Sequence, residues 1–241
     1  GAYTEKGAHS KYAALKFDST YVFLGGGVNE RSSVWLQTSS ANAQKISTDA
    51  IDVVIQDFTE DEISESFMMN LSGKGQVLFS FTINSTRIPS RTFVYNGTAS
   101  QLSGQRVWFE LQSGLTDNSW RGNVIVSAYG KLLIGDAIDG RIGYLNDDDK
   151  TYYGETIFLQ MATAPFAQNG TNVFAGELEA TFESGVGLTD GQGSDPVVMM
   201  DFSDDGGRSF IGTFKRKIGK IGKYEQRSIW QRQGLFPVSR T

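Results

Sequence analysis

Short runs in which apolar and polar residues alternate, separated by turn residues, make up most of the chain. The run Gln76–Ile83 is the clearest, because Val, Phe, Phe and Ile occupy its odd-numbered positions and Gln, Leu, Ser and Thr its even-numbered ones. A period of two predicts a β-strand with one buried face. The preceding run, Phe67–Leu71, is joined to it by the turn Ser72–Gly75 and predicts the partner strand of an antiparallel hairpin.

Similar runs recur before and after this hairpin, divided by residues that favour turns. They predict strands at Tyr12–Phe17, Tyr21–Leu24, Val34–Thr38, Gln44–Ser47, Thr92–Tyr95, Val107–Leu111, Val124–Tyr129, Leu132–Ile134 and Ile142–Leu145, with Thr156–Met161 as an extension. The most apolar strands return at intervals of roughly 55 residues, which indicates a repeated β-unit.

One segment departs from this period. Apolar residues follow Thr48 and Asp49 at helical spacing, and either of these two can cap a helix. Thr59 and Glu62 then have the spacing of a capping box, which predicts a second helical turn. We therefore expect a short helical insertion near residues 49–63.

The last third of the chain predicts four more strands. Glu177–Thr181 and Val197–Phe202 are expected to form an antiparallel pair, and Lys215–Ile218 and Gln226–Arg232 to follow as two further strands. The segment between the second and third has the spacing of an Asp box, in which a carboxylate accepts backbone N–H groups and a glycine takes a left-handed conformation. The box residues are Ser203, Asp205, Gly207, Ser209 and Phe210.

Together these patterns predict an all-β protein. The expected architecture is a β-propeller-like array of antiparallel four-stranded blades, incomplete or closed, with a β-sandwich as the alternative, because short strands and frequent turns fit both. We expect blades and the helical insertion over residues 1–150. A C-terminal antiparallel β-module, with the Asp-box corner and a basic end, is expected over residues 151–241.

The charge of the chain is unevenly distributed. The whole sequence carries a formal charge of −5, yet the residues from Arg208 onward hold nine Lys or Arg against one acid. This asymmetry suggests contact with an acidic partner or with DNA, while an edge strand protected by cations is the alternative. The candidate contact residues are Lys215, Arg216, Lys217, Lys220, Lys223 and Arg232.

The sequence offers no convincing catalytic or metal site. It contains no cysteine and one histidine, His9, so disulfides and thiolate metal ligands are excluded. The run Asn146–Asp149 has oxygen ligands for Ca²⁺ but lacks the spacing of an EF-hand, and a solvated acidic loop is the simpler interpretation. We expect no cofactor, no metal, no enzymatic activity and no membrane span.

The chain also resembles a known family. Matching segments run through it in order, among them "KGAHSKYAALKFDSTYVFLGG", "STDAIDVVIQDFTEDEI", "WFELQSGLTDNSWRGN", "GDAIDGRIGYLN" and "SGVGLTDGQGSDPVVM" followed by "SDDGGRSF" and "KRKIGKIGKYEQRSIWQRQG". These are similar to the podovirus packaged-DNA stabilisation proteins, or tail accessory factors. Members of that family have a long N-terminal half that this sequence lacks, and they continue beyond the last strand seen here.

The resemblance implies a structural protein of the virion tail, assembled in the host bacterial cytoplasm. It implies docking as a homo-oligomeric ring, a hexamer, under the portal and adaptor, where the protein closes the channel, retains packaged DNA and carries the tail needle and tailspikes. Contact with the packaged DNA is a further option. Two alternatives stay open: a carbohydrate-binding or sialidase-like propeller, suggested by the Asp box, and a receptor-binding module.

Overall fold

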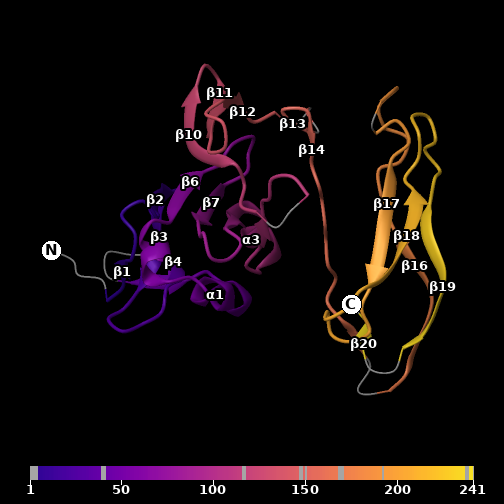
Figure 1. Cartoon of the computed structure of the whole chain (residues 1–241), viewed down its shortest axis with the longest axis horizontal. Coiled ribbons are helices and arrows are strands. Elements are labelled where there is room, and N and C mark those ends of the chain that lie inside the picture. Colours follow the sequence, from indigo (N-terminus) through magenta and orange to yellow (C-terminus); the bar gives the residue numbers. More distant parts are fainter. Residues whose placement is uncertain are drawn as a thin grey trace. The chain divides into compact units, whose positions relative to one another are not determined.

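The computed structural model describes residues 5–38, 42–115, 118–146, 149, 151–167, 171–191, 193–236 and 239–240. The chain divides into two compact units, Gly1–Leu159 and Gln160–Thr241 (Figure 1). The described strands pair almost entirely in antiparallel fashion, and each unit has its own sheets.

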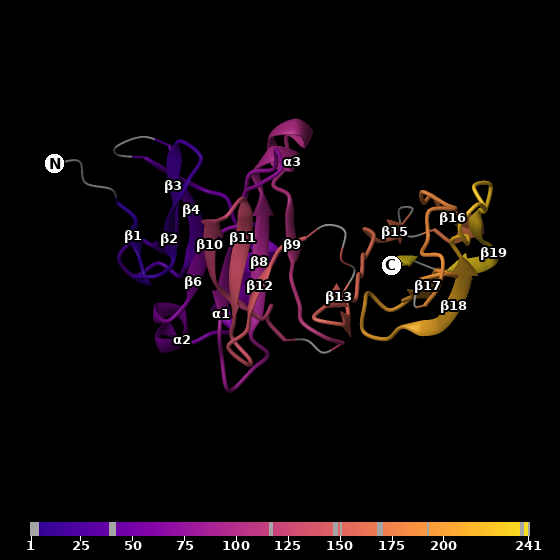
Figure 2. The ribbon, with the colours of Figure 1, turned by 90° about the horizontal axis from the view of Figure 1, so that it is seen from above.

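The first sheet contains five strands, and β3 is at its centre. β3 pairs with β2 along its first half, with β1 at its end and with β4 on its other side, and β4 pairs with β5. The violet and indigo strands of this sheet lie together in Figure 2. The bounds are β1 (Gly7–Ala8), β2 (Ala14–Phe17), β3 (Thr20–Gly26), β4 (Ser33–Gln37) and β5 (Ala43–Lys45).

Two short helices follow, at the position predicted for the helical insertion. α1 (Asp49–Gln56) is capped by the Thr48 side chain, which accepts from the Ile51 N–H, and it buries Ile51 and Ile55. α2 (Glu60–Ser64) begins with the predicted capping box between Thr59 and Glu62. Both predictions are confirmed. Caps can be predicted from sequence because they depend on residues that are close along the chain.

The second sheet is a four-stranded meander in chain order, and it shares the first core with the first sheet and the two helices. Its strands are β6 (Phe67–Asn70), β7 (Leu78–Ile83), β8 (Arg91–Asn96) and β9 (Trp108–Glu110). Phe79 and Phe81 are fully buried, and their rings contact Trp108 edge-on at 5.7 and 5.8 Å between centroids. A third helix, α3 (Gly97–Ser103), was not predicted; Asn96 caps its start and Gly104 ends it in a left-handed conformation.

The third sheet has three strands, β10 (Gly122–Ala128), β11 (Lys131–Asp136) and β12 (Ile142–Tyr144), at the predicted places. Ile134 packs in a second core with Trp120. The expected extension over Thr156–Met161 is wrong, since only Thr156 lies in a strand, at the end of the small hairpin formed by β13 (Thr151–Tyr152) and β14 (Glu155–Thr156).

The second unit is built from two-stranded sheets. β16 (Val173–Ala180) pairs with β19 (Ser228–Phe236), β17 (Val197–Phe202) with β18 (Ile211–Lys217), and β15 (Phe166–Ala167) with β20 (Ser239–Arg240). The expected pairing of the strand at Glu177–Thr181 with the strand at Val197–Phe202 is therefore wrong. Alternation specifies the two faces of a strand, but it does not specify the neighbouring strand across a long loop.

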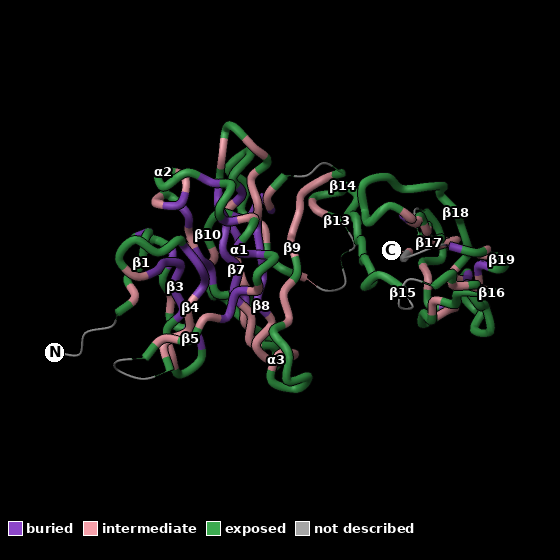
Figure 3. Tube along the Cα trace, turned by 90° about the horizontal axis from the view of Figure 1, so that it is seen from below, coloured by how far each residue is buried: buried purple, intermediate pink, exposed green. Residues whose placement is uncertain are grey.

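The two units differ in how much they bury. Buried segments gather on β3, β4 and β7 in the first unit, whereas most of the second unit is exposed (Figure 3). In the second unit the buried apolar side chains among the described residues are Trp230 and Phe236. Trp230 donates its indole N–H to the Phe214 carbonyl at 2.8 Å, which ties β19 to β18.

Candidate functional site

The predicted basic residues lie on β18, on the loop that follows it and on β19. Lys215 faces Met199 across the β17–β18 pair, and Lys217 faces Val197. Directly opposed residues of an antiparallel pair share one face of the sheet. Because Met199 and Val197 are both about half exposed, this face of the hairpin is a mixture of cations and apolar side chains.

The basic residues differ in what they contact. Arg216 is exposed but lies along β19, since its Nε donates to the Ile229 carbonyl at 2.6 Å and its guanidinium lies 6.0 Å from the Trp230 ring. Lys217 pairs with Asp195 at 2.7 Å, and this lowers the pKa of that carboxyl. Arg216 therefore contributes to packing, and the positive charge of Lys217 is partly compensated.

The remaining cations are available to a partner. Within the described parts of the chain, no ion pair engages Lys215, Lys223 or Arg232, and all three are exposed. Lys220 lies 3.9 Å from Asp195, which already binds Lys217 more closely. Arg240, by contrast, pairs with Asp204 at 2.6 Å and stacks on Phe236.

The Asp box forms the corner between β17 and β18. The Asp205 carboxylate accepts the backbone N–H groups of Arg208 and Ser209 at 2.9 and 2.8 Å and also bonds the Ser209 hydroxyl. These bonds, with the hydroxyl of Ser203, lower the pKa of Asp205. Gly207 takes a left-handed conformation with φ 85°. The oxygens of Ser203 and Asp205 thus bond groups of the turn itself, so the box is a structural corner. Phe210, the last residue of the box, is half exposed.

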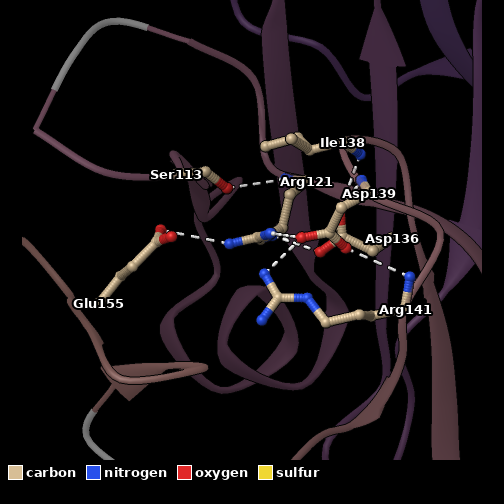
Figure 4. A network of polar contacts seen from close by, with 7 residues as sticks. All are labelled: Ser113, Arg121, Asp136, Ile138, Asp139, Arg141 and Glu155. Atoms are coloured by element: carbon tan, nitrogen blue, oxygen red, sulfur yellow. Dashed lines mark hydrogen bonds and ion pairs between the residues drawn. The ribbon is translucent and has the colours of Figure 1, made fainter.

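A buried ion-pair network in the first unit was not predicted. Arg121, whose side chain is 6% exposed, bonds three carboxylates: Asp136, Asp139 at 3.3 Å and Glu155 at 3.2 Å (Figure 4). Its guanidinium also lies 4.9 Å from the ring of Tyr153. The network joins the start of β10, the β11–β12 turn and β14.

The local geometry around Asp136 explains why its charge is tolerated in the interior. Burial raises its pKa, but the N–H groups of Ile138 and Asp139 and the Arg121 guanidinium outweigh burial, so the pKa of Asp136 lies below its ordinary value. The sequence carries no signal for Arg121 as a partner of these carboxylates. Arg121 follows Trp120 without any pattern that distinguishes it from a surface arginine.

A hollow of about 540 Å³ adjoins this network, but its lining differs from that of a sialidase-like site. Such a site requires arginines free to bind a substrate carboxylate and an activated tyrosine. Here Arg121 is saturated by carboxylates and Arg141 pairs with Asp139, while burial raises the pKa of the Tyr152 hydroxyl. The arrangement suits a structural clamp that holds the β13–β14 hairpin.

Other candidate residues of the sequence show no catalytic arrangement. His9 is exposed and its Nδ1 lies 2.6 Å from the Ser32 hydroxyl. In the run Asn146–Asp149 the amide of Asn146 donates to Asp149 at 2.9 Å, and the two residues between them lie outside the described chain. The described residues contain no group of three acids or histidines arranged for a metal and no helix long and apolar enough to cross a membrane.

Comparison with known proteins finds relatives for both units. Residues 1–150 match the sequence profile of a family described as "Bacteriophage P22 Gp10, beta-propeller", and residues 159–240 match "Bacteriophage P22 Gp10, beta-sandwich". The chain is 24% identical over 230 residues to the tail hub protein gp10 of Salmonella phage P22, which covers 95% of this chain and 45% of the relative. It thus spans about half the length of the curated relative it matches.

These matches agree with the fold. The predicted all-β class is confirmed, and the two architectures weighed as alternatives correspond to the descriptions of two successive regions. Among the residues described, no sheet closes on itself, and the first two sheets are the ones with four or more strands.

Proposed function

The chain belongs to the bacteriophage P22 Gp10 family, and from that membership we propose that it is a structural component of the tail of a short-tailed phage. The observation that carries the proposal is that both units match this family in the same order. A mechanical role agrees with the site geometry, in which the buried charges are paired with one another rather than directed at a substrate.

We propose further that the protein docks under the portal and adaptor, helps to retain packaged DNA, and supports the needle and tailspikes. Its contacts would be repeated around a symmetry axis, so that modest interfaces add by multivalency and resist internal pressure. Lys215, Lys223 and Arg232 are the best candidates for contacts with an acidic neighbour or with DNA, because they have no ion-pair partner within the described chain. Lys217 and Lys220 would join them if Asp195 released its cations.

The test is binding of the full-length protein to a purified portal and adaptor assembly, measured by co-sedimentation at low and high salt. One variant carries Lys215→Ser, Lys223→Ser and Arg232→Ser, and a matched control carries three substitutions in the first unit, Lys11→Ser, Lys16→Ser and Lys131→Ser. We expect saturable, salt-sensitive binding that the first variant weakens and the control does not. Equal binding by both variants would remove these cations from the interface, and no binding by the wild type would contradict the docking proposal.

A further inference from the structure

A groove of about 900 Å³ lies in the first unit between the β3–β4 loop and the helices α1 and α2. The apolar part of its lining consists of Val28, on the β3–β4 loop, and of Ile55, Phe58 and Ile63, which are buried in the first core. Val28 on the opposite loop is 92% exposed. The groove is open and Val28 at its edge has no cover, so the groove can receive an apolar side chain of a partner.

The helical side of the groove is strongly acidic. Residues 49–65 contain seven acids and no cation. Glu60 and Asp61 line the groove and have no ion-pair partner within the described chain. The cation in the lining is Arg31, which donates to Gln56, and Glu30 across the groove is paired with Lys6. An apolar groove with two free acids at its edge suits a protein segment that is both apolar and basic.

The second unit presents a segment with that composition. In the loop after β18, Ile221 is 53% exposed and lies between Lys220 and Lys223, and Tyr224 is 70% exposed. If this loop contacted DNA, its lysines would bind phosphates. The exposed Ile221 would then have no role, since phosphate contacts are made by polar and charged groups. A protein partner accounts for both.

The loop is held in shape by bonds to its surroundings. The Gly222 N–H donates to the Gly185 carbonyl at 3.0 Å, and the Lys223 N–H donates to the Lys220 carbonyl at 2.9 Å. The Ser184 hydroxyl donates to the Tyr224 carbonyl at 2.8 Å. A loop that is already ordered loses less conformational entropy on binding than a free one.

We propose that the loop Lys220–Tyr224 of one molecule docks into the acidic groove between the β3–β4 loop and α1–α2 of a second copy of this chain. Ile221 enters beside the exposed Val28, while the two lysines face Glu60 and Asp61. The contact is head-to-tail: the copy that gives its loop keeps its groove free, and the copy that gives its groove keeps its loop free, as closure of a ring requires. This inference rests on the proposed function only for the expectation that several copies assemble.

The test uses disulfide trapping between two introduced cysteines, because residues 1–241 contain no cysteine of their own. A tagged full-length Ile221→Cys protein is mixed with an untagged Ser64→Cys protein, since Ser64 lines the groove, and mildly oxidised. We expect a mixed disulfide of the tagged and untagged chains. The control replaces Ser64→Cys by Ile138→Cys, an exposed position on the β11–β12 turn, and should trap at least about tenfold less.

Charge exchange then tests the complementarity. Adding Lys220→Glu and Lys223→Glu to the loop variant, or Glu60→Lys and Asp61→Lys to the groove variant, should each reduce trapping about tenfold, and combining both should restore it. Equal trapping at Ser64 and Ile138, or no restoration by the exchange, would overturn the proposal. Co-sedimentation with the portal and adaptor of the wild-type protein and of a Lys215→Ser, Arg232→Ser variant, whose Lys220–Tyr224 loop is unchanged, separates the two claims, because a failed docking under the portal leaves the trapping between copies intact.

Discussion

Replacing Arg121 by methionine removes the cation at the centre of the buried network while keeping most of the side-chain volume. Of its three partners, Glu155 and Asp139 are partly exposed and regain water, with side chains 60% and 38% exposed. The Asp136 side chain is 1% exposed and cannot. The cost of the substitution therefore falls mainly on Asp136.

Leaving one member of a buried ion pair unpaired costs about 3 to 5 kcal/mol. Asp136 keeps the N–H groups of Ile138 and Asp139, at 2.7 and 3.3 Å, so we place the loss at the lower end, about 3 kcal/mol. Adding Asp136→Asn should recover part of this loss, because the amide carbonyl still accepts both N–H groups without a buried charge.

The measurement is hydrogen exchange of the β10 and β11 amides, because a chain of two units need not unfold in one step. We expect faster exchange in this sheet for Arg121→Met and no change in β18. Arg141→Met is the matched control: Arg141 also pairs with Asp139 but is exposed, so its loss should be much smaller. A loss below about 1 kcal/mol for Arg121→Met, or no recovery in the double variant, would refute the reasoning.

Three further outcomes follow from the same contacts. The pKa of Asp136 in the folded protein is below its ordinary value of 3.8, so the ionised carboxylate stabilises the fold fully above about pH 4. This stabilisation is lost as the pH falls through the folded pKa, and thermal unfolding of the first unit between pH 6 and 2 measures the loss. Asp205→Ala removes the acceptor for two backbone N–H groups and should speed trypsin cleavage after Arg208, whereas Asp201→Ala, on the exposed side of β17, should not. Trp230→Ala removes a side chain that is 2% exposed and should lower the free energy of unfolding of the second unit by about 3 to 5 kcal/mol, so the amides of the β16–β19 pair should exchange faster. Gln231→Ala, at an exposed position of the same strand, should leave those amides protected.

Features that depend on neighbouring residues were predictable. Thr59 and Glu62 lie within one turn of each other, and Asp205 bonds groups three and four residues further on. The alternation in Gln76–Ile83 likewise specified the apolar face of β7, in which Phe79, Phe81 and Ile83 are inaccessible to solvent. The expectation of a single buried face was wrong, because Ser80 and Thr82 on the other face are covered as well. α3 had a local signal too, Asn96 before the helix and Gly104 after it, which the strand pattern around it obscured.

Features that join distant residues were not predictable. Asp136 and Glu155 lie 15 and 34 residues from Arg121, and none of the three has a sequence context that indicates the others. The partner of β16 was missed for the same reason, since β19 begins 48 residues after the end of β16. The basic residues were found as a group by composition, but composition could not show that the Arg216 guanidinium bonds the backbone of β19 beside Trp230.

The sequence by itself therefore determined the all-β class, the positions of most strands, the helical insertion and the surplus of cations after Arg208. Each of these depends on short-range periodicity, capping or charge count, which the order of residues expresses directly. Only the tertiary structure decided which strands pair, which cations stay free, and that an acidic groove and a basic loop exist as formed surfaces. Those properties depend on contacts between segments far apart in the chain, where burial selects one pairing among many that local patterns allow.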